Sequence, residues 1–235
     1  MSKKLMRLFV GLVFTLSASM AHALYIVAPN ANETTPGSTI TYMLGSGFDT
    51  GDVLQWVFSA SEFSSISSGA SITSIGFRAN AIFGDLSYSQ WDLQISSAVN
   101  PAPTLDSTFA NNIGADAVTV YSGALNILAS SLTAGTFFDI DFLTPYIYSG
   151  GDLLMTLVWQ GPSTNRLAID ANSVSDGLGN TNFAFSTTAT SGTTDYYSYP
   201  VTRFGVSSVP EPSTIALLSV GLAGMGFARK RMKAA

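Results

Sequence analysis

The sequence contains no cysteine, a single histidine, His22, and no lysine between Lys4 and Lys230. A chain without cysteine relies on core packing and hydrogen bonds rather than on disulfides. Apart from His22, the segment between these two lysines has no histidine, cysteine or lysine. It therefore cannot form a Ser-His-Asp triad, a Cys-His pair, a Schiff base or an ordinary zinc site. Carboxylates, hydroxyls and arginines remain, and we expect a protein that is not an enzyme.

Positive charge is also scarce in the long middle of the chain. Residues 24–208 contain three arginines, Arg78, Arg166 and Arg203, whereas the other seven of the 10 basic residues lie near the termini. All but one of the 15 acidic residues lie in this same segment, which gives it a formal charge of −11. Such a surface repels nucleic acid and anionic lipid, so neither is expected as a partner.

The last 27 residues consist of three successive parts. The first is the motif Val209-Pro210-Glu211-Pro212-Ser213-Thr214, in which two prolines keep Glu211 in an extended, exposed segment. An apolar run at 215–228 follows, and then a basic cluster made of Arg229, Lys230, Arg231 and Lys233. The apolar run favours lipid, and the basic cluster resists crossing the membrane and stays cytoplasmic. The body of the chain is therefore expected outside.

The apolar run predicts a transmembrane helix, but a short one. Its 14 residues span about 21 Å at ~1.5 Å per residue, against a hydrocarbon core of ~30 Å. Three glycines, Gly221, Gly224 and Gly226, weaken the helix further. These features favour a transient span over the alternative, an ordinary C-terminal membrane anchor.

The N-terminus has the pattern of a signal peptide. A positive region at 3–7 precedes an apolar stretch at 8–16 and the small-x-small sequence Ala21-His22-Ala23. We expect a signal helix, cleavage that is specified by Ala21 and Ala23, and a mature protein that begins at Leu24. The predicted organisation is a signal peptide at 1–23, a folded body at 24–208 and a sorting segment at 209–235.

The C-terminal pattern resembles the PEP-CTERM sorting signal of Gram-negative bacteria, which is processed by an exosortase, an integral-membrane enzyme. The resemblance covers about a tenth of the chain, with all three parts in the right order. It implies an exported protein that is held transiently at the inner membrane and cut near Pro210-Glu211-Pro212. Release to the cell surface or the extracellular space would follow, and the implied partner is the exosortase.

Within the body, apolar and polar residues alternate with period two, for example at 91–96 and 138–142. The stretch 152–159 is apolar on both faces and predicts a central strand. Further predicted strands are 25–28, 39–44, 53–58, 72–77, 117–121, 183–186 and 199–206. Residues 172–197 are predicted to be surface loops around one short strand. The expected fold class is all-β, an antiparallel β-sandwich that is jelly-roll-like.

Parts of the body resemble a domain that recurs among proteins with this tail. The matching blocks are QWVFSASEF at 55–63, ITSIGFR at 72–78, TFANNIGAD at 108–116, and LTPY at 143–146 followed by GDLL at 151–154. Asp152 stands where the resemblance leads us to expect asparagine. That family is similar to secreted surface proteins of uncertain biochemistry, so the resemblance implies a β-rich fold and no particular activity.

Asp139 and Asp141 lie two residues apart on one predicted strand, with side chains roughly 7 Å apart. This separation suits the two carboxylates of a glycosidase, which lie ~5–9.5 Å apart across a sugar cleft. Calcium ligands are another interpretation. Alternating polar residues on a strand are more often simply its solvent-exposed face, which is the interpretation we prefer.

Oxygen-bearing residues in predicted loops could form a structural calcium site, because calcium takes six to eight oxygen ligands. These residues are Asp49, Asp52, Asp106, Asn111, Asn112, Asp116, Asp170, Asn172, Asp176 and Asn180. No Asp-x-Asp-x-Asp-Gly string is present, so this indication is compositional only. We assign no metal ligand and expect no cofactor.

Several other side chains have a preferred structural interpretation. Residues 111–116 predict a tight turn with Gly114 at positive φ. Arg78 is predicted to pair with a loop aspartate of this chain rather than with a ligand carboxylate. Trp56, Trp91 and Trp159 are predicted to pack in the core. The candidates for an exposed sugar-binding platform are Tyr196, Tyr197 and Tyr199.

Three classes of function remain open. The first is a surface or matrix protein associated with exopolysaccharide or biofilm, the second a glycoside hydrolase or carbohydrate-binding module, and the third an ice-binding protein, a label given to this type of tail. An ice-binding face needs a regular threonine array, and 39–41 and 187–190 are too isolated to form one. Nothing in the sequence singles out a carboxyl group with a raised pKa. We prefer the first class, without catalytic residues.

Overall fold

Strands in which apolar and polar residues alternate build two antiparallel sheets. The computed structural model describes residues 23–207 except for 43, 46–50, 103, 162–164, 174–176 and 196–198. The predicted signal helix and transmembrane helix therefore lie outside the described residues. Within the described residues, no helix has the length and apolar character needed to cross a membrane.

The six-stranded sheet contains the apolar strand that was predicted to be central. Its strands, in spatial order, are β13 (Thr193–Asp195), β12 (Gly179–Ala184), β3 (Gly51–Phe58), β10 (Leu153–Gln160), β6 (Gln90–Ser97) and β7 (Val118–Tyr121). β10 pairs with β3 on one side and with β6 on the other, each over eight residues. One face of β10, from Leu153 to Trp159, packs in the main core, and Leu154 on the other face packs in a smaller apolar cluster with Val57 and Leu105, which agrees with the predicted central strand.

The seven-stranded sheet is organised around one long strand, β4 (Ser71–Ile82). Its main path runs from β1 (Ala23–Ala28) through β15 (Thr202–Ser207) and β4 to β11 (Leu167–Asn172) and β14 (Tyr199–Pro200). Off this path, β9 (Phe137–Ile147) pairs with β4, and β2 (Thr39–Thr41) pairs with β11. The first part of β4 thus lies between β15 and β9, and its last part pairs with β11.

Short elements lie between the strands of the two sheets in the described part of the chain. β5 (Leu86–Tyr88) and β8 (Leu125–Ile127) form a separate two-stranded sheet. Four short 3₁₀ helices are η1 (Asn30–Asn32), η2 (Ala60–Phe63), η3 (Phe109–Asn112) and η4 (Ala129–Ser131).

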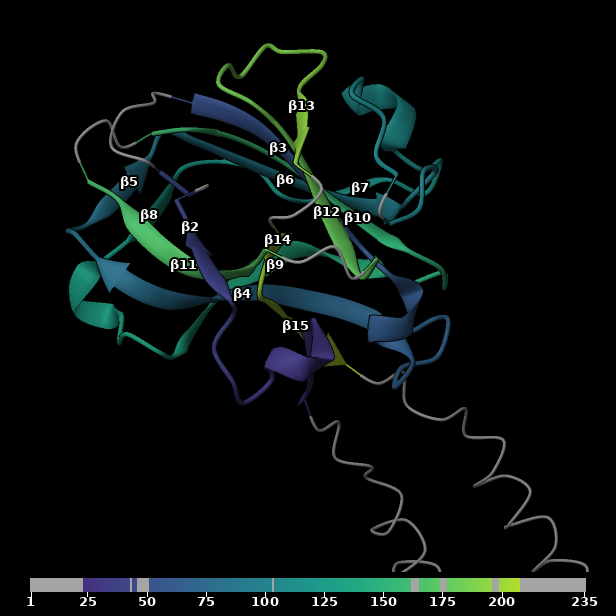
Figure 1. Cartoon of the computed structure of the whole chain (residues 1–235), viewed down its shortest axis with the longest axis horizontal. Helices are drawn as coiled ribbons and strands as arrows, with labels where there is room; N and C mark the ends of the chain where they lie inside the picture. Colours follow the sequence, from purple (N-terminus) through teal and green to yellow (C-terminus); the bar gives the residue numbers. More distant parts are fainter. Residues whose placement is uncertain are drawn as a thin grey trace, which may run out of the picture. The chain divides into compact units, whose positions relative to one another are not determined.

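The core lies between the two sheets. The ring centroids of Trp56 on β3 and Phe77 on β4 are 6.2 Å apart, and those of Phe58 on β3 and Phe204 on β15 are 5.5 Å apart. Since β3 belongs to one sheet and β4 and β15 to the other, these contacts join the two layers that Figure 1 shows. All three tryptophans are fully buried, which confirms their predicted place in the core.

The all-β, antiparallel fold class is confirmed, whereas its jelly-roll-like character stays a prediction. Several strand predictions were wrong in detail. β11 was not predicted, although all six of its residues are buried. Likewise, 172–197 contains the last residue of β11 and two whole strands, β12 and β13, where one short strand among surface loops was predicted. β2 is shorter than predicted, and β12 overlaps the strand predicted at 183–186 only at its last two residues.

Candidate functional site

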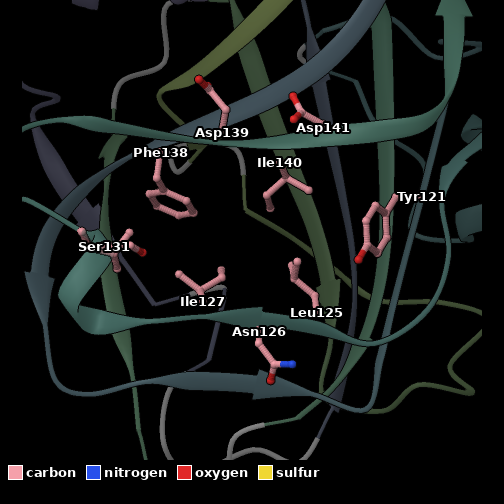
Figure 2. A pocket seen from close by; sticks show the side chains of 10 residues that line it. Tyr121, Leu125, Asn126, Ile127, Ser131, Phe138, Asp139, Ile140 and Asp141 are labelled. Atoms are coloured by element: carbon pink, nitrogen blue, oxygen red, sulfur yellow. The ribbon is translucent and has the colours of Figure 1, made fainter.

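The two candidate carboxylates on β9 lie on its solvent-exposed face and not in the hollow beside it. Asp139 and Asp141 are exposed, and Asp139 accepts two hydrogen bonds from Arg203, at 3.0 Å from Nε and 2.5 Å from Nη2. Figure 2 shows both carboxylates pointing away from the hollow into which Phe138 and Ile140 point. This is the arrangement of a solvent-exposed strand face, as the preferred interpretation of the sequence expected.

The hollow itself is apolar. It has a volume of about 340 Å³ and lies among β7, β8, η4 and β9. Its walls include the side chains of Leu125, Ile127, Phe138 and Ile140, which point into it in Figure 2. No charged group of the described lining residues points into this space, so the hollow offers no pair of carboxylates for general acid–base chemistry.

The outer side of the seven-stranded sheet carries the three arginines of the body. Phe77, Phe204 and Leu167 are each next in sequence to one of them and pack in the core. Because successive side chains on a strand point to opposite faces, Arg78 on β4 and Arg203 on β15 lie on the other side of the sheet. Arg166 comes directly before β11, where the bond from the Phe83 N–H to the Arg166 carbonyl continues the pairing with β4, so we assign it to the same side. We call this surface, defined by Arg78, Arg166 and Arg203, the arginine face.

On the arginine face, Arg203 lies between two aromatic rings and is paired with a carboxylate. Its guanidinium carbon is 4.7 Å from the ring centroids of both Tyr25 and Phe137, and the guanidinium group binds Asp139 through two bonds. Gly76 makes room for this pair, because a Cβ at that position would lie 2.2 Å from Asp139 Oδ1. The two bonds hold Asp139 in a defined position.

Arg78 is the buried member of the arginine face. Its Nη1 lies 3.3 Å from Asp170 Oδ2, and both side chains are almost fully buried. The guanidinium also donates to the backbone carbonyls of Asn32, Glu33 and Thr35, and it stacks on the Phe137 ring. The predicted internal pair is confirmed. Its partner, however, lies on β11 and not in a loop, which corrects that part of the prediction.

Arg166 lies directly before β11 at the end of the sheet. Its guanidinium carbon is 4.5 Å from the ring centroid of Phe83 and 5.3 Å from that of Tyr42. The ion pairs among the described residues belong to Arg78 and Arg203. No carboxylate in the described part of the chain is therefore paired with Arg166.

The residues considered as calcium ligands are spread over the structure. Four that were expected in loops lie in strands instead: Asp52 on β3, Asp170 and Asn172 on β11, and Asn180 on β12. Asn111 and Asn112 lie in η3, and Asp49 and Asp176 lie outside the described residues. Across the described ranges, no three Asp, Glu, His or Cys side chains come together as a metal site would require.

Asp116 has a structural role that its local sequence did not reveal. Its carboxylate accepts hydrogen bonds from the backbone and hydroxyl of Ser97, from Tyr146 Oη and from Ser149 Oγ. Burial alone would raise the pKa of Asp116, but these hydrogen bonds to the charged form outweigh it, and the net pKa is lowered. Asp116 thereby links β6 to β9.

The expectation of positive φ at Gly114 was wrong, because this glycine is not among the positive-φ residues. A Cβ there would lie 2.2 Å from Ser97 Oγ and 2.5 Å from the Ser97 carbonyl oxygen. The close approach of the two segments, and not a left-handed turn, therefore accounts for glycine at this position.

A buried amide network attaches the segment after β6 to the outer side of the six-stranded sheet. Asn112 donates to Gln55 Oε1 and to the Asp106 carbonyl, and its own Oδ1 accepts from Asn100 Nδ2 and the Asp106 backbone. Asn182 on β12 donates to the Asp106 and Ser107 carbonyls. The network was not predicted, because its members are separated by up to 127 positions in the sequence, from Gln55 to Asn182.

The predicted tyrosine platform is not supported where the structure describes it. Tyr199 is fully buried, with its ring 6.4 Å from that of Phe58, so its predicted exposure was wrong. Tyr196 and Tyr197 lie outside the described residues. An exposed sugar platform built on Tyr199 is excluded.

The two ends of the described body are neighbours. Ala23, the first residue of β1, is paired with Ser207, the last residue of β15. The sorting segment follows at once, and its residues lie outside the described part of the chain, as does Ala21. The roles predicted for the individual residues of the signal peptide and of the sorting segment stay predictions.

Comparison with known families identifies this C-terminal segment. Residues 208–231 match the family model of the PEP-CTERM protein-sorting motif. The C-terminal region is a PEP-CTERM sorting region. The motif implies an exported protein that undergoes membrane-anchored sorting, with an exosortase as its processing partner. A search of curated proteins gave no match.

Proposed function

We propose that residues 24–208 form a non-catalytic protein of the cell surface or extracellular matrix of a Gram-negative bacterium, associated with exopolysaccharide or biofilm. In this proposal the signal peptide is removed at Ala23, the body folds outside the inner membrane, and the apolar run at 215–228 holds it there transiently. An exosortase then cuts near Pro210-Glu211-Pro212. The PEP-CTERM match is the observation that carries the proposal.

The chemistry of the body supports a binding or structural role. It has no cysteine or lysine and, after signal cleavage, no histidine. Of the two candidate glycosidase carboxylates, Asp139 is engaged by Arg203, and both point away from the apolar hollow. The proposal requires no cofactor.

Retention on the producing organism's own exopolysaccharide tests this proposal. Residues 23–207 form one compact unit with its own core, so the body can be purified alone. We expect saturable retention on the polysaccharide, no release of shortened glycan, and no retention on a neutral matrix such as agarose. Glycan breakdown would contradict the non-catalytic role, and the absence of saturable retention would contradict the association with exopolysaccharide.

A further inference from the structure

All three arginines of the body are stacked on aromatic rings, but among the described residues only two of them are paired with a carboxylate. Arg203 stacks on Tyr25 and Phe137 and binds Asp139, and Arg78 stacks on Phe137 and binds Asp170. Arg166 has the same kind of aromatic surroundings without a carboxylate from the described residues. Arg166 thus has aromatic surroundings like those of the other two arginines, and no carboxylate of the described residues is paired with it.

The strands position this third arginine firmly. Phe83 follows β4, Arg166 precedes β11 and Tyr42 follows β2, which are neighbouring strands of one sheet. The Phe83 backbone N–H donates to the Arg166 carbonyl at 3.1 Å, which continues the pairing of β4 with β11. We call Tyr42, Phe83 and Arg166 the Arg166 clamp. The sheet fixes its backbone, and the two rings limit the orientations of the guanidinium.

The Arg166 clamp is open to solvent and has unused hydrogen-bonding capacity. Phe83 is 47% exposed, and the Arg166 side chain forms no hydrogen bond with any described residue. A guanidinium has five N–H donors in a planar fork that matches a carboxylate through two parallel bonds. Stacking on aromatic rings reduces the freedom that such a side chain loses on binding. The clamp is therefore preorganised for a carboxylate.

We propose that the Arg166 clamp binds the carboxylate of an acidic sugar unit, such as a uronic acid, in the exopolysaccharide. This inference rests on the function proposed above and assigns its contact. The guanidinium supplies the charge, and the exposed Phe83 ring offers an apolar surface to the C–H groups of the sugar. The formal charge of −11 opposes a densely carboxylated polymer, so the preferred ligand is a glycan in which acidic units are well separated.

Short oligosaccharides separate the contact at the clamp from long-range repulsion. We would measure binding of a galacturonic acid trimer and of its methyl ester to the purified body by calorimetry, at ~0.15 M salt, where the Debye length is about 8 Å. The methyl ester differs only in lacking the charged carboxylates. We expect the acid to bind at least about tenfold more tightly than the ester, because charge-assisted paired bonds are the strong ones.

The arginine face provides a matched control for the variants. Arg166→Gln should weaken binding of the acid trimer by at least about tenfold, whereas Arg203→Gln should leave it unchanged, because Arg203 already binds Asp139. Arg166→Lys keeps the charge but loses the planar fork, and should bind with intermediate affinity. Thermal melting of each variant establishes that it is folded.

The outcomes distinguish this inference from the proposed function. If Arg166→Gln binds the acid trimer as wild type does, or if the ester binds as tightly as the acid, the inference is wrong. Equal affinity for a glutamate-rich peptide would overturn the assignment to a sugar. If wild type and Arg166→Gln are retained equally on the exopolysaccharide, the clamp is not the contact but the proposed function stands. If the trimer binds through Arg166 and the exopolysaccharide retains nothing, the proposed function fails.

Discussion

The buried pair of Arg78 and Asp170 provides the sharpest test of the packing of the body. Asp170 is 2% exposed and accepts hydrogen bonds from Arg78, from Asn80 Nδ2 at 3.0 Å and from the Gly37 backbone at 3.4 Å. Asp170→Ala removes the charge that balances Arg78, a residue that is only 5% exposed. Breaking a buried pair by removing one partner costs about 3–5 kcal/mol of unfolding free energy.

The structure places this cost at the lower end of that range. After the substitution, Arg78 keeps its bonds to three backbone carbonyls and its contact with the Phe137 ring. These contacts offset part of the lost interaction, and we expect a loss of about 3 kcal/mol. Removing both charges with Arg78→Met and Asp170→Ala should cost less than the sum of the two single substitutions, because the two side chains interact.

Urea unfolding followed by tryptophan fluorescence measures this loss, because Trp56, Trp91 and Trp159 are all fully buried and become exposed on unfolding. Asp141→Ala is the matched control, since Asp141 is an exposed aspartate on the same sheet, and its effect should stay within about 0.5 kcal/mol. If Asp170→Ala proves no more destabilising than this control, the assignment of Arg78 and Asp170 as a buried, mutually dependent pair is refuted.

Further predictions concern the two faces of the sandwich. Gly76→Ala should cost about 1–3 kcal/mol, because the new Cβ would lie 2.9 Å from a backbone carbonyl oxygen and 2.2 Å from Asp139 Oδ1; a melting temperature equal to that of wild type would contradict this. Asn112→Ala should cost about 2–3 kcal/mol in urea unfolding, because buried amide partners lose their bonds, whereas the exposed Asn126→Ala should cost almost nothing. For Asp116→Asn, the destabilisation should be largest near neutral pH. The pKa of Asp116 is lowered on folding, so its contribution is present above the unfolded pKa of about 3.9 and is lost as the pH falls through the lower folded pKa. A difference between wild type and Asp116→Asn that stays constant from pH 7 to pH 2 would show that the carboxylate bonds contribute nothing.

The pattern of apolar and polar residues was sufficient to predict the strands whose apolar side chains are buried and whose polar side chains lie nearer the solvent. The burial of β6 alternates as its sequence does, and β10 is apolar on both faces because the main core packs on one face and the cluster of Val57 and Leu105 packs on the other. β11 escaped prediction because it contains Asp170 and Asn172, which are typical loop residues. These two residues can be buried in a strand only because Arg78, Asn80 and Asn32 bond to them from distant parts of the chain.

In the candidate site too, features made of neighbouring residues were predicted, whereas features made of residues far apart in the sequence were not. The C-terminal motif is a continuous stretch of sequence, and it was found from its residues alone. The Arg166 clamp joins residues from the ends of three strands, and nothing near Tyr42, Phe83 or Arg166 in the sequence indicates that they meet. Tyr199 was misjudged for a similar reason. Its polar sequence surroundings suggested exposure, but its ring packs against Phe58.

Export followed by proteolytic release is tested most directly by the fate of the chain in the producing cell. Cell fractions would be analysed by mass spectrometry of the intact protein, for wild type and for Glu211→Ala. We expect wild type outside the inner membrane, beginning at Leu24 and shortened near Pro210-Glu211-Pro212, and Glu211→Ala uncut and held in the membrane fraction. Wild type found at full length in the cytosol, or Glu211→Ala processed as wild type is, would contradict this route.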